Sequence, residues 1–533
     1  MKSSMKKAAT ALLAAALLAA TPCTSVFGAQ TYYVNDGSST LTMADAYAIG
    51  ASGEAAKLPD RGVYAATANG TQMLGGTEYD DVQPNIPNGL IRAGLAFGST
   101  ALDAVHLQIK TGSGFAFGYY DEEAGRVFRV VGSTAESSVA VVADTNVTVG
   151  SSTFGAYHIE LDDTYTDFEA ACAAAAAHGG YPVFYNGTYR VRIGSFETAD
   201  AASASSAAAS GSVVSGGSRG VLVVKAGTDQ ILFGFDCGST KSLTLAPQNS
   251  SGTAITQVAE CKYRSTDRSC TYNGDFQFTR FDTQQPQKLT LVNFVDLESY
   301  VKGVVPYEMS SGWPLEALKA QAVCARTYAA SHMNGVPAYG FDITATTTSQ
   351  VYLGTIEASA NSDRAVDETA GKFVRYQGKL CETFFFAADG GATENSENVW
   401  VAEVPYLRGV IDPYEKDIDF YCKSWGTSVS RDAVGDISVT YTPIGNVMTV
   451  TVGVKTYSKD NVRTFLTKIC GLRYNSRHFT VEYDAASNVY NVVGGGYGHN
   501  CGMSQWGAKA MAEVHGKTYE EIISFYYTGA YVS

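Results

Sequence analysis

The sequence is poor in charged side chains and has no excess of positive charge. Charged residues make up 17% of its 533 positions, and the formal net charge is −14 at pH 7. So few charges argue against a coiled coil or a disordered chain, and the abundance of Gly and Tyr is typical of a β-rich protein. The negative balance disfavours nucleic acid as a partner and offers no basic patch to an anionic membrane. A neutral polysaccharide would be unaffected by that charge.

Long apolar runs are also missing, apart from one near the start. The Ala/Leu run at 8–20 is too short to span a bilayer, and Lys2, Lys6 and Lys7 precede it. This arrangement predicts a secretory signal peptide at residues 1–29, with an uncleaved anchor as the alternative. The mature protein is therefore expected to be secreted or to lie in the cell envelope, with no membrane anchor.

None of the ten cysteines belongs to a C-x-x-C motif. A zinc ribbon and a thioredoxin-type site are therefore not indicated. Loss of the signal peptide removes Cys23 and leaves an odd count. Cys261 and Cys270 bracket a short basic loop and could form one local disulfide, whereas buried free thiols are the alternative.

Apolar and polar residues begin to alternate near Gly89, and this period of two predicts strands. An Ala-rich helix is predicted at Thr166–His178, with the Gly179-Gly180 pair ending it. The fold class expected from these patterns is α+β and multidomain. The predicted divisions are a leader at 30–84, a β-rich domain at 85–155, a small αβ unit at 156–210, a β-rich unit at 211–264 and an α+β core at 265–533.

Within the αβ unit, the segment TYRVRIGSFETADAA resembles the second half of a SPOR domain. SPOR domains are small modules that bind peptidoglycan strands stripped of their peptides. The resemblance implies that sugar would lie on the sheet face carrying Tyr189, Arg190 and Phe196. An ordinary αβ packing unit with buried aromatic side chains is the alternative.

The stretch VKGVVPYEMSSGWPLEALKAQAVCARTYAASHM at 301–333 places one acid, Glu308, just before a predicted helix. Pro314 suits the first helical turn, and Leu and Ala recur at three and four residues along one face. A lone carboxylate in apolar company is a candidate for a raised pKa and for proton transfer. The alternative is a loop acid hydrogen-bonded to helix N–H groups.

Four ordered motifs make the region from about Tyr272 onward similar to the SpoIID/LytB family. The first is VNFVDLESYVKGVVPYEM followed by WPLEALKAQAVCARTYA, and the second is FDITATTTSQVYLG. The third is GGATENSENVW with PYLRGV, and the last is GGGYGHNCGMSQWGAKAMAEVHGKTYEEIISFYYTGA. The segment LIRAGLAFGS also looks like the first strand of relatives, which would tie the N-terminal part to the same architecture.

This resemblance implies a lytic transglycosylase that cuts peptidoglycan glycan strands, preferring strands without peptides, with sporulation as one setting. Such an enzyme needs one acid group, whereas a glycoside hydrolase normally needs two carboxylates. The family's catalytic Glu falls on Glu308. An alternative is a non-catalytic peptidoglycan-binding protein that enhances a cell-wall amidase. A thiol peptidase using Cys501 with His499 lacks an identifiable orienting Asn or Asp.

Six further positions in these motifs are candidates for substrate binding. Arg326 could hydrogen-bond sugar or form a salt bridge that fixes its helix. His499 could equally be a buried, hydrogen-bonded structural residue. The many glycines around it imply close backbone approach, either to substrate or to the loop of Glu308. The full set is Arg326, Gln350, Tyr352, His499, Ser504 and Gln505.

Two departures from the family pattern bear on metal binding. Phe386, Ala387, Ala388 and Asp389 stand where relatives often carry a His-Ser pair, which disfavours a zinc site there. Asn500-Cys501 stands where Gly-Val is usual, and a metal or thiol site made of His499, Cys501 and Cys324 has poor support from the spacing. No metal or other cofactor is predicted.

Overall fold

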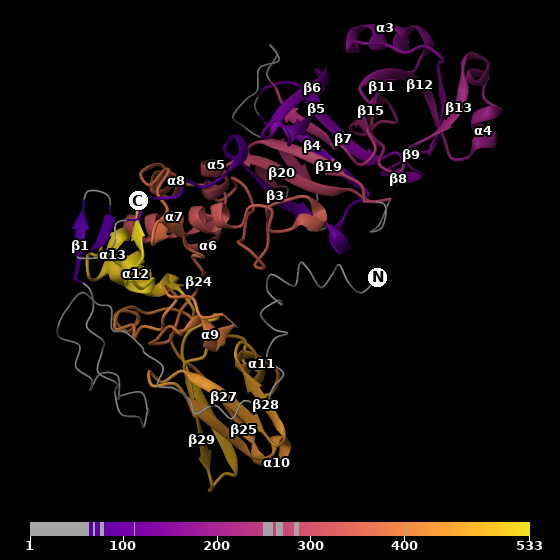
Figure 1. The fold of residues 1–533 in the computed structure, drawn as a ribbon. Helices are drawn as coiled ribbons and strands as arrows, with labels where there is room; N and C mark the ends of the chain where they lie inside the picture. The colour runs from indigo at the N-terminus through magenta and orange to yellow at the C-terminus, as the bar shows by residue number, and fades with distance from the viewer. Residues whose placement is uncertain are drawn as a thin grey trace. The chain divides into compact units, whose positions relative to one another are not determined.

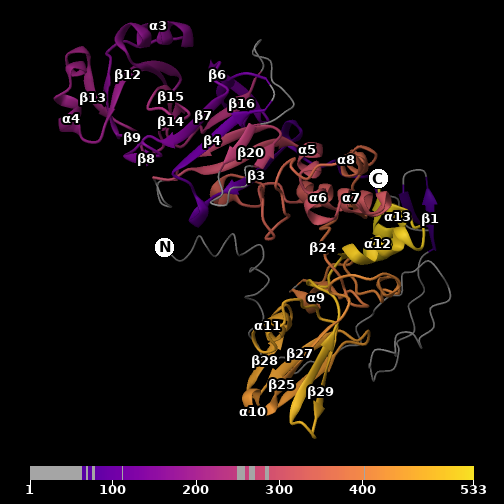
Figure 2. The same ribbon diagram turned by 180° about the vertical axis from the view of Figure 1, so that it is seen from behind.

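The computed structural model describes residues 63–67, 70–74, 79–110, 112–248, 259–262, 270–281, 287–400 and 402–533 (Figures 1 and 2). The predicted signal peptide and most of the predicted leader lie outside the described residues. The chain divides into two compact units. Unit 1 combines the described residues up to Pro84 with Glu308–Ser331 and Ser359–Ser533, and unit 2 combines Asn85–Tyr307 with His332–Ala358. Both units mix strands and helices, so the predicted α+β class is confirmed.

A seven-stranded sheet in unit 2 joins the N-terminal part of the chain to the segment that leads to Glu308. β3 (Leu90–Ala96) runs antiparallel to β20 (Thr290–Asp296). This pairing confirms the expectation that LIRAGLAFGS belongs with the region carrying the family motifs. Along the sheet the order is β21-β3-β20-β19-β16-β5-β6. The remaining strands are β21 (Ile343–Thr344), β19 (Asp275–Thr279), β16 (Leu243–Pro247), β5 (Phe115–Asp121) and β6 (Val127–Thr134).

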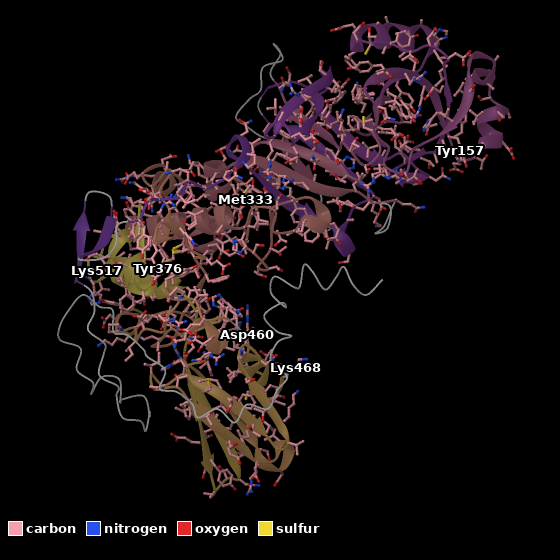
Figure 3. The ribbon with its side chains drawn as sticks, in the orientation of Figure 1. Tyr157, Met333, Tyr376, Asp460, Lys468 and Lys517 are labelled. Atoms are coloured by element: carbon pink, nitrogen blue, oxygen red, sulfur yellow. The ribbon has the colours of Figure 1, made fainter. Side chains whose placement is uncertain are left out.

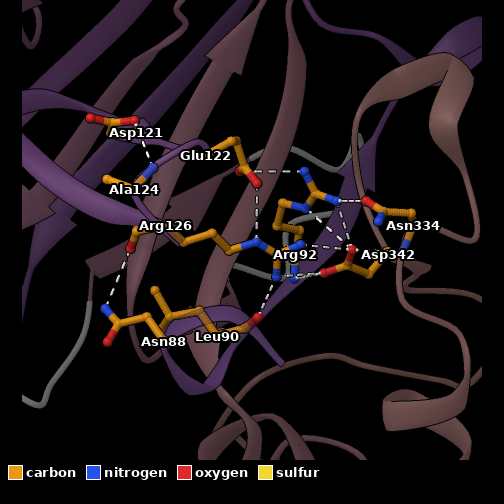
Figure 4. Close-up of polar contacts among 9 residues, drawn as sticks. All are labelled: Asn88, Leu90, Arg92, Asp121, Glu122, Ala124, Arg126, Asn334 and Asp342. Atoms are coloured by element: carbon orange, nitrogen blue, oxygen red, sulfur yellow. Dashed lines mark hydrogen bonds and ion pairs between the residues drawn. The ribbon is translucent and has the colours of Figure 1, made fainter. Parts of the chain in front are cut away.

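Two arginines hold the residue that precedes β21 (Figure 4). The carboxylate of Asp342, which is buried, lies 2.8 Å from a guanidinium nitrogen of Arg92 and 3.0 Å from one of Arg126. Arg92 also contacts Asn334, and both arginines lie 3.3 Å from Glu122. Burial acts to raise the pKa of Asp342, but the hydrogen bond from Arg92 and the charges of both arginines outweigh it and lower that pKa. The network ties three separate segments of unit 2 together.

Unit 2 also contains a ten-stranded sheet, in the order β13-β10-β12-β11-β15-β14-β7-β4-β17-β18. Its first four strands and two helices follow the chain order β-α-β-β-α-β, a known supersecondary arrangement. α3 (Phe168–His178) begins after the Asp167 cap and ends at Gly179, whose φ of 66° is left-handed as predicted for a glycine stop. The sequence predicts a SPOR module here, and that assignment stays a prediction, as do the predicted domain boundaries.

The elements of this second sheet come from most of the segment between residues 104 and 272. Its strands are β10 (Tyr157–Glu160), β11 (Tyr181–Tyr185), β12 (Thr188–Phe196), β13 (Ser212–Ser215), β14 (Val221–Lys225), β15 (Ile231–Asp236), β7 (Ser138–Ala143), β4 (Ala104–Ile109), β17 (Ala259–Lys262) and β18 (Cys270–Tyr272). Helix α4 (Ala199–Ser203) and the small hairpin β8 (Val147–Val149) and β9 (Ser152–Phe154) complete the region.

Cys261 and Cys270 are direct partners in the β17–β18 pair. Cys270 is a free thiol, and the side chain of Cys261 lies outside the described residues. Among the described residues the other cysteines are also free, and most of them are buried. The alternative of buried apolar thiols therefore describes these residues.

Helix α7 (Leu315–Ser331) is the central helix of unit 1. The carbonyl of Pro314 accepts a hydrogen bond from the N–H of Leu318, so Pro314 stands directly before the first helical residue. The predicted apolar face is buried, with Ala322 and Ala325 fully enclosed. Such small side chains allow neighbouring helices to approach closely. Three helices pack against α7 in both views: α8 (Ala360–Asp367), α12 (Gln505–Glu513) and α13 (Tyr519–Tyr526) (Figures 1 and 2).

The rest of unit 1 consists of small sheets and short helices. Asp460 and Lys468 mark the two ends of α11 (Asn461–Lys468), whose apolar face contributes Val462, Phe465 and Leu466 to a local core (Figure 3). The strands are β1 (Val63–Thr67), β2 (Gly70–Leu74), β22 (Val374–Tyr376), β23 (Lys379–Leu380), β24 (Phe385–Phe386), β25 (Trp425–Ser430), β26 (Ile437–Tyr441), β27 (Val447–Val452), β28 (Lys455–Ser458), β29 (Phe479–Asp484), β30 (Val489–Gly494), β31 (Met503–Ser504) and β32 (Tyr531–Val532). The other helices are α9 (Ser396–Val399) and α10 (Arg431–Val434).

Among the described residues, every helix is too short or too polar to cross a membrane.

Candidate active site

Glu308 ends a single helical turn and stands where unit 1 resumes. Helix α5 (Leu297–Lys302) follows β20, and α6 (Val305–Glu308) comes directly after it. The Glu308 side chain is partly buried, while the next residue, Met309, is 1% exposed. A turn at 310–313 then leads into α7. Asn361 fixes this turn by donating to the carbonyl of Ser311 at 2.8 Å and to that of Trp313 at 3.1 Å.

The amide of Gln505, the first residue of α12, lies between Glu308 and α7. Its Nε2 is 3.4 Å from Oε2 of Glu308 and 3.4 Å from Oε1 of Gln321. Gln321 is fully buried on α7, and its own Nε2 has no hydrogen-bond partner among the described residues. Both contacts are long for hydrogen bonds, which leaves room for Gln505 to tighten onto the carboxylate when a ligand binds.

Ser504 anchors the start of α12 behind this contact. Its Oγ accepts the N–H of Gly507 at 3.1 Å, which caps the helix, and donates to the carboxylate of Glu415. Ser504 is fully buried. Its observed partners are therefore protein groups that hold the helix which carries Gln505.

Three buried carboxylates lie together at this point: Asp389, Asp412 and Glu415. These carboxylates accept hydrogen bonds from neutral groups. One of them is the Tyr526 hydroxyl, which donates to Asp412 at 2.6 Å. No Lys, Arg or His in the described part of the chain forms an ion pair with them. Burial raises the pKa of Glu415 to about 7, with the charge of Asp412 adding to the rise. Burial and then the charges of Glu415 and Asp412 raise the pKa of Asp389 well above its usual range.

The cluster therefore retains a proton near neutral pH, and the unpartnered Oδ2 of Asp389 is where a proton shared with Asp412 fits. The carboxylate oxygens lie within 4.8 Å of one another, so they could also ligate a cation.

Arg326 is fully buried on α7 and is held by protein groups. Its guanidinium donates to the carbonyl of Val366 at 3.2 Å and to that of Lys372 at 3.3 Å, with Thr369 at 3.5 Å. These contacts join α7 to α8 and to the turn that follows it. Substrate binding by Arg326 stays a prediction.

Gln350 and Tyr352 belong to unit 2, and each is 1% exposed. Gln350 Nε2 lies 3.3 Å from the hydroxyl of Tyr300, whose ring also packs on Tyr352 with centroids 4.7 Å apart. The Tyr352 hydroxyl donates to Asn293 at 2.7 Å. Both side chains thus serve the interior of unit 2, and contact with substrate stays a prediction for them.

His499 uses both ring nitrogens within the protein. Its Nδ1 accepts the N–H of Cys501 at 3.2 Å, so the proton sits on Nε2, which donates to the carbonyl of Phe385 at 3.1 Å. Three aromatic rings surround it, and burial lowers its pKa to about 4. Burial also raises the pKa of the Cys501 thiol well above its usual range. A neutral imidazole with no free lone pair beside a protonated thiol suits neither a metal site nor a thiol nucleophile.

The glycine-rich loop before α12 packs closely on the segment at 384–390. A Cβ at Gly502, where φ is 85°, would lie 2.1 Å from the carbonyl oxygen of Phe384. A Cβ at Gly498 would lie 2.6 Å from the side-chain Cβ of Phe386. The close approach inferred from the sequence is therefore made to this neighbouring segment, because β31 and β24 pair in parallel.

Comparison with known proteins places this arrangement in a family. A family model described as stage II sporulation protein matches residues 285–376. Over 275 residues the chain is 37% identical to an uncharacterized protein of Brachyspira hyodysenteriae, a match that covers 48% of this chain and 71% of that protein. Over 270 residues it is 33% identical to stage II sporulation protein D of Bacillus subtilis, covering 45% and 76%. The chain belongs to the SpoIID/LytB family.

Another relative in the SpoIID/LytB family is the amidase enhancer of Bacillus subtilis. The chain is 32% identical to it over 288 residues, which cover 43% of this chain and 39% of the enhancer.

Asn500, in the glycine-rich loop, has a clear backbone role. Asn500 stands in the left-handed region with φ of 62°, where Gly and Asn are the most readily accommodated residues. Its amide donates to the carbonyl of Asp389 at 2.8 Å and to that of Ala392 at 3.2 Å. Asn500 thus suits the left-handed backbone at this position and adds two hydrogen bonds.

Sequence reasoning missed Gln321 and the three buried carboxylates. The sequence does carry a signal for Gln321, which is a polar residue between Leu318 and Ala322 on the face predicted to be buried. A buried polar side chain needs a hydrogen-bond partner. Asp389, Asp412 and Glu415 gave no comparable signal, because they come from loops without periodicity.

Proposed function

We propose that this SpoIID/LytB member is a lytic transglycosylase that cuts the glycan strands of peptidoglycan, preferring strands without peptides. The contact between Gln505 and Glu308 carries the proposal, because it joins the first and last family motifs around one carboxylate. An amide at 3.4 Å can steady a carboxylate without neutralising it. Glu308 is thereby oriented and still able to exchange a proton.

The reaction needs one group that acts first as an acid and then as a base. Protonated Glu308 gives its proton to the oxygen between C1 of muramic acid and the next sugar, and the C1–O bond breaks. The Glu308 carboxylate then takes the proton of the 6-hydroxyl of the same muramic acid, and that oxygen bonds to C1. A 1,6-anhydro sugar results, Glu308 regains its proton, and no water is consumed.

The three clustered carboxylates of unit 1 do not supply the second catalytic acid that a hydrolase would need. Asp389, Asp412 and Glu415 are at most 5% exposed, so they are closed to a sugar substrate. A hydrolase of the usual kind would need a second accessible carboxylate at a set distance from the first.

The setting of this activity is proposed to be the cell envelope, after export. The segment at 157–215 has the order β-α-β-β-α-β and contains the run that resembles half of a SPOR domain, which supports a SPOR-like role in holding peptidoglycan. Identity to stage II sporulation protein D makes cell-wall remodelling in sporulation the favoured context.

A second candidate function rests on the relative named amidase enhancer. In that case the chain would bind peptidoglycan and stimulate an amidase that removes peptides from the glycan. Glu308 would then have no chemical role.

The test is digestion of peptide-free glycan strands by the purified protein, with mass analysis of the products. We expect anhydro-muramic ends from the parent and none from Glu308→Gln. Glu368→Gln is the matched control, because Glu368 is an exposed acid of the same unit, paired with Lys319 at 2.7 Å. Products carrying an added water would make the protein a hydrolase. Absence of cleavage, with stimulation of an added amidase by both parent and Glu308→Gln, would favour the enhancer.

A further inference from the structure

A continuous group of aromatic side chains lies on unit 1, and none of its members is buried. We call it the aromatic ledge. Trp506 contacts Trp313 with ring centroids 4.6 Å apart, and Tyr421 with centroids 6.2 Å apart. Tyr421 in turn lies 5.0 Å from Tyr474, which lies 5.5 Å from Tyr497. The members of the ledge are Trp313, Phe420, Tyr421, Tyr474, Tyr497 and Trp506.

Two members of the ledge are close in sequence to the residues of the Gln505–Glu308 contact. Trp506 directly follows Gln505, whose amide is 3.4 Å from Glu308, and Trp313 lies in the turn between Glu308 and α7. Phe420 stacks on the Trp506 ring at 4.9 Å with an interplanar angle of 15°, so this end of the ledge is stiffened by ring contacts. Trp313 and Trp506 are therefore the members of the ledge nearest in sequence to the proposed site.

The far end of the ledge is the exposed end. Tyr421 is 56% exposed and Tyr497 is 36% exposed, with Tyr474 between them. Large aromatic side chains left open to water in one contiguous group mark a binding surface rather than ordinary packing. The faces of such rings carry partial negative charge and attract the weakly positive C–H groups that cover a pyranose ring.

Two cations also lie over rings of the ledge, although the whole chain has a net charge of −14. The Lys509 ammonium lies 5.0 Å from the Trp506 ring centre and 5.7 Å from that of Trp313, and it pairs with Glu513 at 3.0 Å. The Arg473 guanidinium lies 5.3 Å from the Tyr474 ring centre, and Arg473 is exposed. A ligand with anionic groups spaced along its length could pair one of them with each cation.

We propose that the aromatic ledge is a binding subsite for the glycan strand, and that Lys509 and Arg473 select strands whose peptides have been removed. The identity of the polymer rests on the proposed function. Removal of the peptide frees the lactyl carboxylate of each muramic acid, which is an amide while the peptide is attached. The rings hold the sugar faces, and the two cations pair with these newly freed carboxylates.

The rings are tested by titrating soluble peptide-free glycan fragments while following tryptophan fluorescence. All four tryptophans, Trp313, Trp400, Trp425 and Trp506, lie in unit 1, so binding to the SPOR-like segment of unit 2 is silent. The titration uses the full chain with Glu308→Gln, which leaves the fragments uncut.

We expect the double substitution of Tyr421→Ala with Tyr497→Ala to weaken binding about tenfold, and the corresponding Phe pair to bind as the parent does. Tyr483→Ala is the matched control, because Tyr483 is 43% exposed on β29 and lies outside the ledge. Unchanged affinity in the double Ala variant would overturn the proposal that the ledge binds the glycan strand.

The cations are tested by comparing peptide-free fragments with chitin oligosaccharides, which have the same backbone without the lactyl carboxylate. The parent is expected to favour the peptide-free fragments, and the combination of Lys509→Gln with Arg473→Gln to lose most of that preference and its salt dependence. Lys517→Gln is the control, since Lys517 lies before α13 and pairs with Glu521 (Figure 3). A preference unchanged in the double Gln variant would overturn the role of the cations.

The ledge and the proposed reaction can fail separately. If the protein binds fragments through the ledge but does not cut them, the proposed transglycosylase reaction is refuted and the glycan-binding role of the ledge stands. If the double Ala variant cuts strands with the same KM as the parent, the proposed reaction stands and the glycan-binding role of the ledge is refuted.

Discussion

The Nε2 atom of Gln505 lies 3.4 Å from Oε2 of Glu308, and the two residues are 197 positions apart in the sequence. Glu308 follows the strand–helix segment that leads into α7, whereas Gln505 begins α12 after the glycine-rich loop. The contact therefore depends on the packing of α12 against α7, and it gives the last family motif a direct influence on the proposed acid.

Gln505→Leu is expected to lower kcat about tenfold while leaving KM close to that of the parent, because the amide positions Glu308 without holding the sugar. Steady-state kinetics on peptide-free strands give both constants. Gln505→Asn, with a shorter amide, should recover part of the rate. If both variants instead lost thermal stability in proportion to their loss of kcat, Gln505 would have a purely structural role.

Glu415 should make unit 1 less stable as the pH rises. Its pKa in the folded protein is about 7, raised by burial from its ordinary value of 4.5. The stabilisation is fully present below about pH 4.5 and is lost as the pH passes through 7. We expect Tm to fall between pH 5 and pH 8, and to fall less in Glu415→Gln. A Tm that rises over this range in the parent alone would contradict the assignment.

Arg326→Ala should cost on the order of 3 kcal/mol of unfolding free energy, because it leaves the carbonyls of Val366 and Lys372 without their buried donor. Denaturant unfolding followed by tryptophan fluorescence reports on unit 1. Arg364→Gln on α8 is the control, since the Arg364 side chain is 63% exposed and should change stability little. A raised KM with unchanged stability would mean that Arg326 contacts substrate.

Asp342→Asn should loosen unit 2 around β3 and β21, because the two guanidinium groups of Arg92 and Arg126 would lose their buried anion. Hydrogen exchange of the amides in these strands measures the effect, which is expected to be faster exchange at pH 7. Because the folded protein lowers the pKa of Asp342, the carboxylate stabilises unit 2 at neutral pH. This stabilisation is lost as the pH falls through the lowered pKa. Exchange rates equal to the parent's at pH 7 would refute the role of this network.

Much of the local structure could be predicted from residues close together in sequence. The Ala face of α7, the stop at Gly179 and the acid at the end of α6 all follow from short patterns. The four motifs also identified the family. Arg326, Gln350 and Tyr352 were singled out as polar residues within these motifs, but a motif does not say whether its polar groups face water or the interior.

What the sequence by itself determined is therefore the set of elements and the family to which the chain belongs, because helix and strand periods are local properties of the backbone. Only the tertiary structure decided that Gln505 meets Glu308 and that Asp389, Asp412 and Glu415 share a buried space. It also decided that rings from five separate places in the chain form one ledge. These groupings depend on how α12 and the loops pack around α7. Side chains on non-periodic loops carry no spacing from which such contacts can be predicted.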